Sequence, residues 1–181
     1  MADATISRVR MRDLARRGRP GDGDLVASTI CAGDVIAFRD VKATMLLADY
    51  AVVSDGKLTI VGGGWSQTGP EPSSFGIGLL IQVPWDQANT MHAFAVELVD
   101  SDGAEVILQT AEDEEQPVAF GGEFEVGRPP GLKPGTPLDF PVAVNSTPLP
   151  LEAGRYEWRL TIDGKSREDW TLPFTVRSEE A

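Results

Sequence analysis

The chain has 181 residues, of which 41% are apolar and 24% are charged, and its formal net charge is −12. This length suits one globular domain, and the acidic balance repels phosphate backbones, which argues against nucleic acid as a partner. Cys31 is the sole cysteine and therefore has no disulfide partner within the chain. No apolar run approaches the roughly 20 residues that span a bilayer, and no signal-peptide core is present, so we expect a cytoplasmic bacterial protein without a membrane span.

Residues 1–40 differ from the rest of the chain in composition. Residues 1–20 hold six Arg against two Asp, whereas from Val41 onward nine Lys and Arg face twenty-two Asp and Glu. Residues 6–17 could form a short basic helix that the Gly- and Pro-rich residues 17–24 end. The composition predicts a disordered or weakly helical arm, or an annotated start that lies upstream of the true one near Val41. A basic arm that binds a partner and a targeting peptide are the alternatives.

Residues 41–65 are predicted to form a β-hairpin. Apolar side chains recur at every second position over residues 41–53, an Asp-Gly turn follows at residues 54–57, and the alternation then resumes. The glycines at 62–64 lack the Lys and Ser/Thr of a phosphate-binding P-loop. We therefore expect a bulge or a close backbone approach beside Trp65.

The remaining chain repeats the pattern of alternating apolar residues and short turns. The strand at residues 75–83 is small or apolar on both faces, so we expect it to be a central strand covered on both sides. Residues 151–156 have the pattern of a tyrosine corner, in which the hydroxyl of Tyr156 bonds to the backbone a few residues upstream. Further strands are predicted at residues 91–100, 104–109, 118–126, 137–144, 156–162 and 170–176. The strands at 91–100 and 104–109 are expected to pair as a hairpin across residues 100–103.

About nine strands and no convincing helix predict an all-β fold. The expected architecture is a Greek-key antiparallel β-sandwich, immunoglobulin-like or C2-like, over residues 41–177, with a short tail at 178–181. Trp158 and Trp170 share the phase of the apolar positions in their strands, so both are expected in the core. Trp85, at a strand end, is the tryptophan expected to be most exposed.

The sequence contains no convincing catalytic constellation. His92 is the sole histidine, so neither a zinc site nor a Ser-His-Asp arrangement is expected, and a structural role for this strand residue is predicted. No cofactor and no catalytic residue are predicted. A hydrolase that uses an Asp/Glu pair is the weaker alternative, since such carboxylates must lie about 5 to 10 Å apart in a cleft.

The loops at residues 84–89 and 128–135 are predicted to form the working surface. Trp85, Asp86 and Arg128 are the candidate binding residues, because Trp and Arg are enriched at interface hot spots. The expected function is a non-enzymatic intracellular binding or assembly module, with an unknown protein partner or self-association. The alternative is a calcium-dependent ligand or membrane-surface binder. Its oxygen ligands would come from acidic loops, namely Asp86, Asp100, Asp102 and residues 112–115.

Four segments resemble a family of uncharacterised bacterial proteins, a domain of unknown function. They read KATMLLADYAVVSDGKLTIVGGGW, VPWDQAN, GEFEVGRPPGLKPGTPL and LPLEAGRYEWRLTIDG. The resemblance begins near Val41 and includes none of residues 1–40. It implies a compact β-protein and no particular activity, so no functional residue is carried over.

Overall fold

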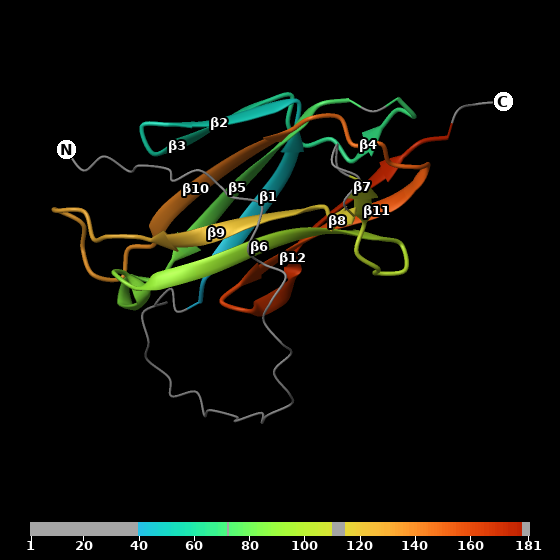
Figure 1. The fold of residues 1–181 in the computed structure, drawn as a ribbon. Coiled ribbons are helices and arrows are strands. Elements are labelled where there is room, and N and C mark those ends of the chain that lie inside the picture. Colours follow the sequence, from blue (N-terminus) through green and yellow to red (C-terminus); the bar gives the residue numbers. More distant parts are fainter. Residues whose placement is uncertain (1–39, 72, 110–114, 179–181) are drawn as a thin grey trace, which may run out of the picture.

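The computed structural model describes residues 40–71, 73–109 and 115–178 (Figure 1). The predictions for residues 1–39 lie outside this part of the chain. Twelve strands and one 3-10 turn make up its secondary structure, which confirms the all-β prediction. None of the described residues belongs to a helix long and apolar enough to cross a membrane. The elements are β1 (Lys42–Ala48), β2 (Tyr50–Ser54), β3 (Lys57–Val61), β4 (Gln67–Thr68), β5 (Phe75–Val83), η1 (Trp85–Gln87), β6 (Met91–Asp100), β7 (Ile107–Gln109), β8 (Glu115–Pro117), β9 (Ala119–Glu125), β10 (Leu138–Ser146), β11 (Gly154–Ile162) and β12 (Lys165–Val176).

Two larger sheets contribute to one core (Figure 1). The smaller sheet has the strand order β1-β5-β10, and the larger has the order β4-β12-β11-β6-β9. If β1, β5, β6, β10, β11 and β12 are lettered A, B, C, E, F and G, the sheets read A-B-E and G-F-C, which is the strand order of immunoglobulin-like domains. One pairing differs from the antiparallel prediction, because the two-residue strand β4 lies parallel to β12.

The apolar face of each sheet supplies the core. Phe94, Phe124, Trp158 and Phe174 are all buried in the same cluster, as the period-two pattern predicts. Phe75 of the smaller sheet lies 6.2 Å from Trp158 of the larger one, measured between ring centroids. Tertiary packing of this kind holds the two sheets together, since burial of apolar surface is the dominant favourable term in folding.

The hairpin predicted at residues 41–65 is correct in its turn and wrong in its extent. β2 and β3 pair across Asp55 and Gly56, both of which have positive φ. β1 ends at Ala48 and pairs with β5 instead. The alternation runs on past Ala48 because Ala51 is buried as well, so the sequence pattern does not show that the chain leaves the sheet there.

The β2–β3 ribbon covers the outer face of β5, which confirms that this strand is buried on both sides. A Cβ atom at Gly78 would lie 2.7 Å from Cδ1 of Ile60, so glycine leaves the space that the ribbon occupies. The expected close backbone approach beside Trp65 is also present, since the amide of Gly64 donates to the carbonyl oxygen of Leu47 at 2.7 Å.

Two predictions concern the end of the larger sheet near Asp100, and one of them is confirmed while the other is wrong. The hydroxyl of Tyr156 donates to the carbonyl oxygen of Glu152 at 3.0 Å, which is the predicted tyrosine corner. Burial and the nearby carboxylates of Glu152 and Asp100 raise the pKa of Tyr156, so the hydroxyl keeps the proton that it donates. The predicted strand at 104–109 is not a full partner of β6, because β7 pairs with β8 and β9 occupies that edge of β6.

Candidate functional site

The structure brings Trp85 and Arg128 together at one end of the two sheets. Arg128 donates from Nε and Nη2 to the carbonyl oxygen of Trp85, at 3.2 and 3.0 Å. Its Cζ also lies 5.3 Å from the centroid of the indole ring, a cation–π distance. Trp85 is half-buried against the core, so it is less exposed than predicted, whereas Asp86 on the same turn is exposed. Trp158 and Trp170 are buried as expected.

The loop between β9 and β10 contains two consecutive turns of the same kind. The amide of Leu132 donates to the carbonyl oxygen of Pro129 at 3.4 Å, and that of Thr136 donates to the carbonyl oxygen of Lys133 at 3.2 Å. Each turn has Pro at its second position and Gly at its third, with φ of 88° at Gly131 and 90° at Gly135. These are the requirements of type II turns, and the proline rings restrict the backbone of this loop.

Leu132 is the apolar residue that these turns leave exposed, with 43% of its surface accessible. It lies between the two Pro-Gly turns, next to Lys133, in the loop that extends away from both sheets (Figure 1). Arg128 ties the start of this loop to η1 through its bonds to Trp85. We call Trp85, Arg128, Leu132 and Lys133 the loop surface. Sequence reasoning selected this segment but missed Leu132, because a lone apolar residue in a Pro-Gly loop gives no signal of its exposure.

A buried histidine connects η1 to the turn between β11 and β12. His92 is only 4% exposed, and its Nδ1 lies 2.8 Å from Oδ2 of Asp163 while its Nε2 lies 3.2 Å from the carbonyl oxygen of Gln87. Both neighbours are acceptors, so the ring donates to both only when both nitrogens carry a proton. The structural role predicted for His92 is therefore observed, as a link between the η1 turn and the β11–β12 turn.

Asp163 is held by two donors in that turn. It accepts from His92 and, through Oδ1, from the amide of Ala93 at 2.9 Å. Partial burial acts to raise the pKa of Asp163, but the hydrogen bonds from His92 and Ala93 outweigh it and the pKa is lowered. The folded state therefore favours the carboxylate, and its stabilisation is present at neutral pH and is lost as the pH falls through the lowered pKa.

Asp163→Asn is expected to lower the free energy of unfolding by about 1 kcal/mol at pH 7, a value discounted for solvent screening of this partly exposed group. The difference from the wild type should begin to shrink below about pH 4, where the carboxyl becomes protonated in the unfolded chain, and should be lost as the pH falls through the lowered pKa of the folded state. Urea denaturation at pH 7 and pH 3 measures both values. Asp169→Asn is the matched control, because Asp169 is exposed and pairs with the exposed Arg167. An equal loss in the two variants would contradict the prediction.

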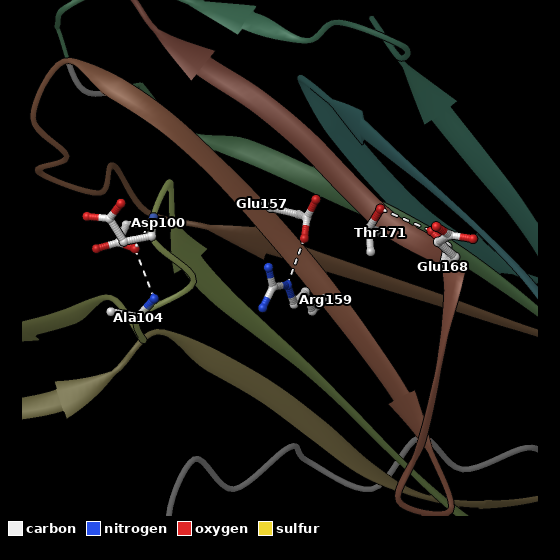
Figure 2. Close-up of polar contacts among 7 residues, drawn as sticks. Asp100, Ala104, Glu157, Arg159, Glu168 and Thr171 are labelled. Atoms are coloured by element: carbon white, nitrogen blue, oxygen red, sulfur yellow. Dashed lines mark hydrogen bonds and ion pairs between the residues drawn. The ribbon is translucent and has the colours of Figure 1, made fainter.

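The carboxylates proposed as calcium ligands lie at two ends of the molecule. Asp86 precedes β6 and Asp100 ends it, and a ten-residue strand is roughly 30 Å long. Asp100 uses Oδ1 to accept from the amides of Asp102 and Ala104, both at 2.9 Å (Figure 2). Residues 112–114 lie outside the described part of the chain, and within it no three His, Cys, Asp or Glu residues form a metal-binding group. Asp86 therefore shares no ion site with Asp100 and Asp102.

An apolar cavity of about 30 Å³ lies between the sheets, against Trp65, Phe75 and Phe174. This volume suffices for about one water molecule, and its walls offer few polar partners. Glu71 is the one carboxylate among the residues that line it. The cavity therefore does not supply the pair of carboxylates that a glycoside hydrolase requires.

Comparison with known proteins identifies the family to which the β-domain belongs. A search of curated proteins finds no match to this chain. Residues 43–177 match a family of unknown function (DUF6941), which agrees with the resemblance seen in the sequence. The match spans β1 to β12 and so includes every residue of the loop surface. The chain therefore belongs to this family of unknown function.

Proposed function

We propose that this chain is a non-enzymatic binding or assembly module that contacts a protein partner through the loop surface. The observation that carries the proposal is the exposure of Leu132 on a loop whose shape is set by two Pro-Gly turns and by the bonds from Arg128 to Trp85. A loop that is ordered before binding loses less conformational entropy when a partner docks, which favours affinity.

The charge of the loop supports a protein partner with acidic groups around an apolar socket. Residues 126–138 contain Arg128 and Lys133 and no Asp or Glu, although the chain as a whole has a net charge of −12. Leu132 would enter the socket, and the two cations would face the carboxylates at its rim. Complementary charge of this kind steers association and discriminates between partners.

Leu132→Asp is expected to reduce partner retention by at least about 30-fold, the effect of losing a hot spot worth 2 kcal/mol. The measurement is quantitative mass spectrometry of proteins that co-purify with the tagged full-length chain from its native host. Ile107→Asp is the matched control, because Ile107 is 52% exposed and lies in β7, beyond the opposite end of β6 from η1. Unchanged retention by Leu132→Asp, or equal loss by Ile107→Asp, would refute the loop surface as the binding site.

The calcium-dependent and hydrolytic alternatives have less support from the structure. For the calcium alternative, Asp86 lies too far from Asp100 and Asp102 to bind the same ion. The hydrolytic alternative requires two carboxylates in one cleft, and the apolar cavity between the sheets has only Glu71 at its wall. Neither alternative accounts for the ordered, exposed loop.

A further inference from the structure

Two arginines line an open hollow at the opposite end of the larger sheet from the loop surface. The hollow has a volume of about 740 Å³ and no carboxylate among its described lining residues. It is formed where β11 begins and β12 ends, beside the segment that follows β4. The residues that line it include Gly154, Arg155, Thr175, Arg177 and Ser178.

Strand register places the donors of the hollow on one face. Arg155 of β11 pairs directly with Thr175 of β12, so their side chains leave the sheet on the same side. Arg177 is two residues beyond Thr175 and continues that face. Its amide and its Nε both donate to the carbonyl oxygen of Thr68, at 3.1 and 3.3 Å, which anchors this arginine beside the hollow.

The arginines of the hollow differ from their neighbours in lacking a carboxylate partner. Arg159 pairs with Glu157 at 2.7 Å (Figure 2), so the carboxylate on β11 closest to the hollow is already engaged. Arg167 pairs with Asp169 at 3.2 Å. Within the described part of the chain, neither Arg155 nor Arg177 forms an ion pair with an acidic side chain. A site with two guanidinium groups therefore remains in a strongly acidic protein.

We propose that this hollow binds a small ligand through an oxyanion, either a phosphate or a carboxylate group. Arginine presents planar N–H donors that match both groups, and hydrogen bonds to an ionised oxygen are about twice as strong as neutral ones. Thr175 and Ser178 also line the hollow, and each residue carries a hydroxyl that can act as a donor. This site is separate from the loop surface, so it does not depend on the proposed protein-binding function.

The test is a titration of the ¹⁵N-labelled full-length chain, followed by NMR. Sodium phosphate is the probe in one arm and sodium malonate in the other, with ionic strength held constant because exposed charges are screened by salt. We expect saturable shifts of the Gly154, Thr175 and Ser178 amides with a dissociation constant in the range of about 1 to 10 mM. The arm that saturates at the lower concentration identifies the preferred group. Shifts that grow linearly in both arms would overturn the proposal.

Arginine variants distinguish a specific site from general attraction to positive charge. Arg155→Gln should weaken binding about fivefold, the upper range for an exposed charge pair. Arg155 is exposed, so this change is not expected to unfold the protein. Arg177→Gln is a second variant of the same site and should also weaken binding. Arg167→Gln is the charge-matched control and should bind as the wild type does. Equal affinity of Arg155→Gln and the wild type would also overturn the proposal, whereas Leu132→Asp should leave this binding unchanged.

Discussion

Trp158→Ala is expected to lower the free energy of unfolding by about 4 kcal/mol, the range found when a large aromatic residue is removed from a core. The indole is 3% exposed and lies 6.2 Å from the Phe75 ring and 5.9 Å from the Phe120 ring. Phe75 belongs to the smaller sheet and Phe120 to the edge strand β9. The substitution therefore removes one side chain that packs against both, and total stability is only about 5 to 15 kcal/mol.

Trp158→Phe separates the loss of packing from the loss of a hydrogen bond. The Nε1 atom of Trp158 is buried and has no hydrogen-bond partner among the residues that the structure describes, so its removal leaves no acceptor there unpaired. We expect this variant to lose about 1.5 kcal/mol, from the smaller ring alone. Urea denaturation followed by circular dichroism measures both variants. A loss as large as that of Trp158→Ala would mean that the indole N–H has a partner, such as a buried water molecule.

Gly121→Ala is expected to destabilise the protein by about 3 kcal/mol, the upper range for overpacking. A Cβ atom at this position would lie 2.4 Å from the carbonyl oxygen of Phe94 and 3.0 Å from Cα of Ala95. Both are backbone atoms of β6, which cannot move aside as a side chain does. Strand β9 would have to shift away from β6 and weaken the pairing between them.

Gly122→Ala is the matched control one residue further along β9. A Cβ atom there would lie 3.7 Å from Cε1 of Phe94, which is an ordinary van der Waals distance. We expect no loss, or a gain of about 0.5 kcal/mol, because alanine restricts the unfolded chain more than glycine does. Thermal and urea unfolding of the two variants under the same conditions test this contrast. Equal destabilisation would show that the glycines act through the general β-propensity of the strand.

The loop surface could be predicted only in outline from the sequence. Trp85 and Arg128 lie 43 residues apart. Their positions in loops predicted that both residues lie at one end of a sandwich, but not that they contact each other. The 71-residue separation of His92 and Asp163 also concealed their bond, because Asp163-Gly164 has the composition of an ordinary hairpin turn. The pairing of Arg155 with Thr175 required the register of two strands.

The sequence alone determined the features that depend on near neighbours along the chain. Alternating apolar residues predicted most strands, Asp55-Gly56 predicted its hairpin turn, and the spacing of Glu152 and Tyr156 predicted the tyrosine corner. Only the tertiary structure decided that the chain leaves the sheet after Ala48, that β4 runs parallel to β12, and which side chains meet at either end. The physical reason is range: backbone preference is set within a few residues, whereas sheet partners are chosen by how the whole chain buries its apolar faces.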